Sequence, residues 1–265
     1  MILKSLNLLN YKNFDAFTVE FDAKINCFVG NNGQGKTTLL DAIYYMCFCK
    51  SYFNASDSLN IRHDTSFFRI ESIFVRKEQQ EYITVKVGQG RKKEMTRNKV
   101  IYKKFSEHIG LLPLVIVAPD DIGLVKNGSE ERRKLIDSTL SQLDSSYLTN
   151  LIKHNKILQQ RNASLKAFAE KRTFNAALLQ TYDELLAPLS QIIHEKRKEF
   201  VAHLTPILQQ FYEKLSRGKE QVSCTYKSDL SDKKFDDMLR ENQMQDRQTQ
   251  RTTQGIHRDD LSFFI

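Results

Sequence analysis

Residues 30–37 read Gly-Asn-Asn-Gly-Gln-Gly-Lys-Thr and satisfy every fixed position of the pattern GxxxxGK[ST]. The apolar run 25–29 before them predicts a β-strand, and apolar residues at helical spacing from Leu39 to Met46 predict a helix after them. A strand, a glycine-rich loop and a helix in this order are typical of a phosphate-binding loop. The pattern therefore predicts a P-loop α/β fold.

Each part of this loop has its own chemical task. Glycines let backbone N–H groups turn toward phosphate oxygens, Lys36 supplies a cation for the β- and γ-phosphates, and the Thr37 hydroxyl suits Mg²⁺. A plain glycine-rich turn would require neither the lysine nor the threonines. We therefore expect ATP and Mg²⁺ to bind here, with Thr37 as the metal ligand. The predicted nucleotide contacts are Gly30, Asn31, Asn32, Gly33, Gln34, Gly35, Lys36, Thr37 and Thr38.

The charge of the chain is concentrated in one stretch. The 265 residues carry a net charge of +8, and segment 76–104 holds ten basic residues against the acidic residues Glu78, Glu81 and Glu94. A DNA-facing surface and a solvated hairpin with a charged tip explain this stretch equally well. The ten basic residues are Arg76, Lys77, Lys86, Arg91, Lys92, Lys93, Arg97, Lys99, Lys103 and Lys104.

The cysteines and the apolar runs indicate the compartment. Cys27, Cys47, Cys49 and Cys224 form no CxxC pair, which argues against a zinc site and a disulfide framework and favours a reducing cytoplasm. The apolar runs are too short to span a bilayer, so we expect no membrane partner.

The predicted secondary structure changes from strands to helices about halfway along the chain. Before residue 118, alternating apolar residues predict strands at 2–9, 17–21, 67–75, 82–87 and 100–102, and an apolar run predicts another at 114–117. A helix is predicted at 132–143, followed by two or three long amphipathic helices over 147–217 that Pro188 and Pro206 kink or divide. Strands at 222–226 and 261–265 follow. The abrupt apolar end predicts a truncated chain.

Five segments, taken in order, resemble the RecF family in the SMC branch of the ABC ATPases. They are 8–14 (Leu-Leu-Asn-Tyr-Lys-Asn-Phe), 32–44 around the P-loop, 117–142 beginning Val-Ala-Pro-Asp-Asp-Ile, 160–162 (Gln-Arg-Asn) and 255–261 (Gly-Ile-His-Arg-Asp-Asp-Leu). The resemblance implies an α/β ABC-type P-loop ATPase head, called lobe I, whose mixed sheet contains antiparallel strands. It also implies an inserted α-helical lobe II, with the N-terminal head at 1–145, lobe II at 146–218 and an incomplete return to the head at 219–265.

The same resemblance extends the site. It implies that Lys12 and Asn13 approach the nucleotide, and that Asp120 senses the γ-phosphate where many SMC-like heads use glutamine. It also implies that the stretch with Arg62 and His63 lies near the adenine, although a surface pair explains these two residues equally well. Segment 257–259 (His-Arg-Asp) would serve the nucleotide, the lobe interface or an ordinary salt-bridged strand end.

The resemblance also implies a function. Members of the RecF family bind ATP, form ATP-dependent homodimers, and hold DNA at single-strand gaps, as single strands and as duplex, so that RecO and RecR help to load recombinase. This implies a bacterial cytoplasmic protein associated with the nucleoid.

The catalytic part of this resemblance is missing. The family would continue after residue 265 with a signature segment and a strand ending in an acidic pair. Only 114–121 approaches that second pattern, and its RecF-like context assigns it elsewhere. No catalytic carboxylate is therefore identified, and we expect poor ATP hydrolysis because phosphoryl transfer depends on positioned charges. The alternative is a nucleotide-gated DNA-binding or SMC-like scaffold head without catalysis.

Overall fold

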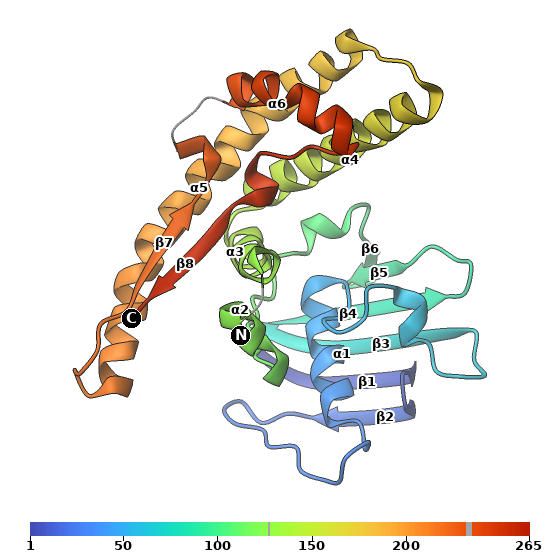
Figure 1. Cartoon of the computed structure of the whole chain (residues 1–265). Helices are drawn as coiled ribbons and strands as arrows, with labels where there is room; N and C mark the ends of the chain where they lie inside the picture. The colour runs from blue at the N-terminus through green and yellow to red at the C-terminus, as the bar shows by residue number, and fades with distance from the viewer. Residues whose placement is uncertain (127, 232–234) are drawn as a thin grey trace. The chain divides into compact units, whose positions relative to one another are not determined.

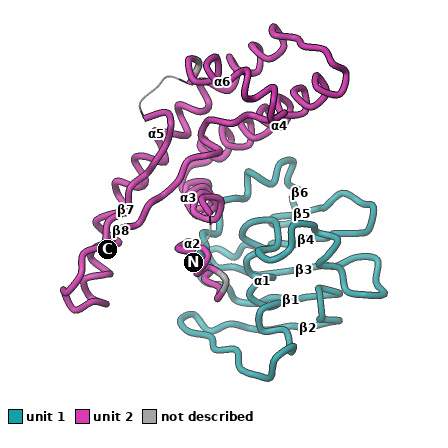
Figure 2. Tube along the Cα trace, in the orientation of Figure 1, with its two compact units in different colours: residues 1–116 teal, residues 117–265 magenta. Residues whose placement is uncertain are grey.

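The computed structural model describes residues 1–126, 128–231 and 235–265. It divides into two compact units, Met1–Ile116 and Val117–Ile265, which Figure 2 shows in different colours. We describe each unit by itself. None of the described helices combines the length and the apolar character that crossing a bilayer requires.

Unit 1 is a six-stranded sheet with one helix packed on it (Figure 1). The strand order is β2-β1-β3-β4-β5-β6, every described pairing is antiparallel, and α1 packs against β3 and β4. The elements are β1 (Ile2–Tyr11), β2 (Phe14–Glu20), α1 (Lys36–Phe48), β3 (Phe67–Arg76), β4 (Gln79–Gly88), β5 (Glu94–Arg97) and β6 (Val100–Ile101), with short 3₁₀ turns at Asp57–Asn60 and Phe105–Glu107.

Alternation along the strands places the core of unit 1 on the side of α1. Leu6 and Leu8 of β1 are fully buried, as are Ile83 and Val85 of β4, while the residues between them face outward. The β3–β4 connection is a two-residue turn in which both residues have positive φ, which matches the twist of the paired strands. The sheet thus presents one apolar face to the helix that follows the P-loop.

Unit 2 is built on two long helices, α4 (Ser145–Lys171) and α5 (Ala176–Ser216). Asp144 caps α4 through its side chain, and Asn175 caps α5 in the same way. A two-stranded antiparallel sheet packs along α5 and α3, and α6 crosses α5 (Figure 1). The other elements are α2 (Gly123–Lys126), α3 (Ser129–Leu143), β7 (Ser223–Lys227), α6 (Phe235–Thr249) and β8 (Asp260–Phe264), with 3₁₀ turns at Pro119–Ile122, Asp229–Ser231 and Ile256–Arg258.

Two predicted strands are absent from the described structure. Residues 25–29 and 114–117 form neither strand nor helix, and no described strand pairs with them. Ile25 and Val29 are 81% and 91% exposed, and Val115 and Val117 are also exposed. An apolar run becomes a strand only where a neighbouring strand satisfies its backbone groups, and the described sheets provide none.

The helical predictions for unit 2 are confirmed with one correction. The predicted helix at 132–143 lies within α3, and the long helices at 147–217 are α4 and α5. Pro188 and Pro206 do not divide α5, which runs without a break for 41 residues. The contacts group 117–145 and 219–265 with the long helices. The lobe boundaries expected at 145 and 218 stay a prediction.

Candidate nucleotide site

The P-loop begins α1 at Lys36, as the motif predicted. Gly35 precedes the helix with φ of 96°, a conformation that costs other residues energy. A Cβ atom placed on Gly35 would lie 2.6 Å from Cζ of Phe14 and 2.9 Å from Nδ2 of Asn13. The loop therefore needs glycine here for two reasons, its backbone angle and the close approach of the β1–β2 turn.

Lys36 spans the loop that it closes. Its Nζ donates hydrogen bonds to the carbonyl oxygens of Gly30 (2.7 Å) and Asn31 (2.8 Å), which holds the cation over the loop backbone. Thr37 is exposed and Thr38 is half-buried, both in the first turn of α1. Positive charge, the N-terminus of a helix and an accessible hydroxyl together suit an anion with a bound Mg²⁺.

The β1–β2 turn lies against the P-loop. Asn13 Nδ2 donates to the Gly33 carbonyl oxygen over 3.3 Å, in line with the expectation that this residue adjoins the loop. The neighbouring Lys12 forms an ion pair, with its Nζ 2.6 Å from Oδ2 of Asp41 on α1. The structure thus joins Lys12 to the P-loop helix through an ion pair that the sequence did not reveal.

Arg62 lies beside the same turn. Its backbone N–H donates to the Asn10 carbonyl oxygen, and its guanidinium forms an exposed ion pair with Asp15 over 3.2 Å. Neither contact tests an adenine role. The side chain of Asp120 lies outside the described residues, so its expected role also stays a prediction.

Asp41 is the site residue that sequence reasoning missed. It is fully buried and accepts hydrogen bonds from the Tyr11 hydroxyl, the Ser51 hydroxyl and the Tyr52 backbone N–H, besides its ion pair with Lys12. Burial and the Asp41 charge raise the pKa of Tyr11, so the phenol remains a donor. The available signal was an acidic residue within the apolar run 39–48, since an acid buried there requires partners.

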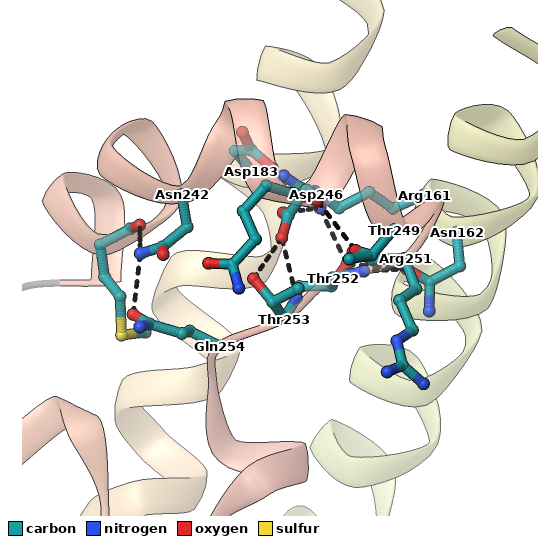
Figure 3. Close-up of polar contacts among 12 residues, drawn as sticks. Arg161, Asn162, Asp183, Asn242, Asp246, Thr249, Arg251, Thr252, Thr253 and Gln254 are labelled. Atoms are coloured by element: carbon teal, nitrogen blue, oxygen red, sulfur yellow. Dashed lines mark hydrogen bonds and ion pairs between the residues drawn. The ribbon is translucent and has the colours of Figure 1, made fainter. Parts of the chain in front are cut away.

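Arg161 and Asn162 of the RecF-like segment 160–162 take part in a polar network within unit 2 (Figure 3). Arg161 of α4 is fully buried and donates to Asp246 (2.6 Å), Asp183 (2.7 Å) and the hydroxyl of Thr252 (2.8 Å). Asn162 accepts both the backbone N–H and the hydroxyl of Thr252. These contacts fasten the segment after α6 to α4 and α5.

Segment 257–259 serves the same scaffold. Arg197 of α5 is buried and donates to Asp137, to Asp259 and to the Ile256 carbonyl oxygen. His257 contacts the Thr252 carbonyl oxygen, and burial lowers the pKa of this histidine to about 4, so it is neutral near pH 7. These described contacts favour the salt-bridged reading of 257–259.

The comparisons with known proteins agree with this architecture. A family model described as an AAA domain matches residues 5–256. The chain is 46% identical over 265 residues to the DNA replication and repair protein RecF of Flavobacterium johnsoniae, covering all of this chain and 74% of that protein. It is 40% identical over 266 residues to RecF of Bacteroides fragilis, covering all of this chain and 71% of that protein.

A solved structure of the recombination mediator protein RecF-ATP in the RecFOR pathway is similar with a TM-score of 0.92. The two chains are 26% identical, and the match covers all of this chain and 73% of the other. This likeness confirms the predicted α/β ABC-type ATPase head with a helical lobe. The identities, the coverage and the fold agree, and the chain belongs to the RecF family of DNA replication and repair proteins.

Proposed function

We propose that this chain binds Mg-ATP at residues 30–38. The observation that carries the proposal is the start of α1, where Gly35 allows the β1–β2 turn to approach and Lys36 lies over the loop carbonyls. Thr37 is exposed in the first helical turn, which fits it to ligate the Mg²⁺ of a bound nucleotide. The related RecF structure with ATP supports the choice of nucleotide.

We further propose that ATP binding assembles a homodimer that holds gapped, single-stranded and duplex DNA and acts with RecO and RecR in recombinase loading, in the bacterial cytoplasm at the nucleoid. Family membership supports this role. The exposed basic residues of segment 76–104 support contact with DNA phosphates, and they include Lys77, Lys86, Arg91, Lys92, Lys99, Lys103 and Lys104. Two other basic residues there are engaged, since Lys93 pairs with Asp57 and Arg97 with Glu81.

We propose that ATP hydrolysis by these 265 residues is weak. Because no carboxylate with a catalytic role is identified in the sequence, we expect the chain to bind ATP with little turnover. Appreciable turnover would place a catalytic acid among the residues assigned to structure. Binding that regulates DNA affinity without turnover would favour the scaffold alternative.

Binding and hydrolysis of Mg-ATP by this chain, with and without gapped duplex DNA, test the proposal. Calorimetry is expected to detect ATP binding that Lys36→Ala weakens at least about 100-fold, because the variant loses the cation that lies over the phosphate-binding loop. The Lys24→Ala variant removes the same charge from an exposed position outside residues 30–38 and should bind ATP as the wild type does. Equal binding by wild type and Lys36→Ala would refute the proposal.

The basic stretch gives a second prediction. Removing two phosphate contacts with Arg91→Ala/Lys92→Ala should weaken duplex DNA binding about tenfold and reduce the slope of log affinity against log salt by about 2. Fluorescence anisotropy across a salt series measures both. The pair Lys153→Ala/Lys156→Ala removes the same charge from exposed positions of α4. Equal losses of DNA affinity in the two double variants would show that segment 76–104 does not form a preferred DNA-binding surface.

A further inference from the structure

Asp41 is fully buried, and both oxygens of its carboxylate accept hydrogen bonds. Oδ2 accepts from the Tyr11 hydroxyl at 2.6 Å and the Ser51 hydroxyl at 2.8 Å, and Oδ1 accepts from the Tyr52 N–H at 2.7 Å. Lys12 is its charged partner, with Nζ 2.6 Å from Oδ2. A buried carboxylate is stable only with such partners, so its position is fixed by the fold.

This fixed carboxylate in turn fixes Lys12. The residue follows a strand end with φ of 51°, and its backbone N–H donates to the Asn60 carbonyl oxygen. The ammonium also lies over the rings of Tyr11 and Phe53, 5.7 and 5.6 Å from their centroids. A long, flexible side chain has therefore already lost most of its rotamer freedom before any ligand binds.

The Lys12 ammonium can still bind an anion. Its side chain is 18% exposed, and an ammonium carries three donors, of which the Asp41 pair requires only one. The next residue, Asn13, donates to the Gly33 carbonyl oxygen, and the ring of Phe14 abuts Gly35. The turn that carries Lys12 thus forms a wall of the P-loop.

We propose that Asp41 is a positioning residue for nucleotide phosphates. It holds Lys12 beside the P-loop, so that a triphosphate meets a second preplaced cation in addition to Lys36. This inference rests on the proposed ATP binding. Asp41 itself, fully buried behind Lys12, acts only through that ammonium.

Calorimetric titration of the 265-residue chain with Mg-ATP and Mg-ADP tests this role. Asp41→Asn and Lys12→Met are each expected to lower ATP affinity about tenfold and ADP affinity less, because ATP carries more negative charge for the ammonium to meet. The double variant should bind ATP about as well as either single variant, since both substitutions disable one unit. A merely structural Asp41 would weaken both nucleotides equally and additively with Lys12→Met, and that result would overturn the inference.

Ser51→Ala is the matched control. It removes one hydrogen bond from the same carboxylate, and two that Ser51 Oγ accepts from the backbone N–H groups of Phe53 and Asn54. The ion pair between Asp41 and Lys12 remains, so the ratio of ATP to ADP affinity should stay at the wild-type value. If Asp41→Asn does not fold, Asp41→Glu replaces it, because one added methylene displaces the carboxylate while keeping its charge. A selective loss of ATP affinity in Asp41→Glu supports the inference, and an unchanged ratio overturns it.

The two proposals fail in different ways. A wild-type chain that binds no ATP, or a Lys36→Ala variant that binds it normally, refutes the nucleotide site itself and with it the role of Asp41. ATP binding that depends on Lys36 but keeps its ATP-to-ADP ratio in Asp41→Asn and Lys12→Met refutes only the positioning role.

Discussion

Gly35→Ala is expected to reduce ATP affinity about 100-fold, or about 3 kcal/mol, by combining backbone strain with a steric clash. At φ of 96° an alanine is strained, and its Cβ would lie 2.6 Å from a carbon of the Phe14 ring. The ring cannot bend away as a flexible chain would, so the β1–β2 turn or the loop must move. Calorimetry with Mg-ATP measures the loss.

Alanine substitutions at two other glycines distinguish the effect of backbone strain from the effect of the steric clash with Phe14. Gly33 has φ of 84°, but an added Cβ would have no heavy atom within 4 Å, so Gly33→Ala should weaken ATP binding less than Gly35→Ala does. Gly90, with φ of 65° and equally open space, lies between β4 and β5 and outside the P-loop residues 30–38. Gly90→Ala should lower stability by about 1 kcal/mol and leave ATP affinity unchanged. Normal ATP binding by Gly35→Ala would mean that the turn does not constrain the loop.

The P-loop was predictable because its chemistry is local. Glycines, Lys36 and the threonines are adjacent in the sequence, and the helix after them follows from apolar spacing. The strand expected at 25–29 was wrong because strand formation depends on a partner that local sequence does not specify. Apolar character at Ile25 and Val29 indicated the tendency to form a strand, not the presence of a neighbour.

The role of Asp41, by contrast, could not be predicted from the sequence. Its partners come from β1, from the turn after β1 and from residues 51–52, so its role depends on contacts that only the folded chain assembles. The RecF-like segments of unit 2 were found from sequence, but their contacts were not. Arg161 and Asp246 are 85 residues apart, and nothing in either neighbourhood indicates that they pair.

Arg161→Met should destabilise the helical unit by about 3–5 kcal/mol, the usual cost of removing one partner from a buried ion pair. The variant would leave Asp246 fully buried with its bonds to Thr253 but without the Arg161 countercharge (Figure 3). It would also remove the bonds from Arg161 to Asp183 and Thr252. Urea unfolding followed by far-UV circular dichroism measures the effect, because α4 and α5 supply most of the helical residues in the described chain.

The matched control is an ion pair that the solvent reaches. Lys134 pairs with Glu130 one helical turn away, and the two side chains are 62% and 71% exposed. Lys134→Ala should therefore cost under about 0.5 kcal/mol. Arg161→Met combined with Asp246→Asn should cost less than the sum of the two single substitutions, because the second removes the uncompensated charge left by the first. Additive losses, or a loss in Arg161→Met no larger than in Lys134→Ala, would contradict a fastening role for the Arg161 network.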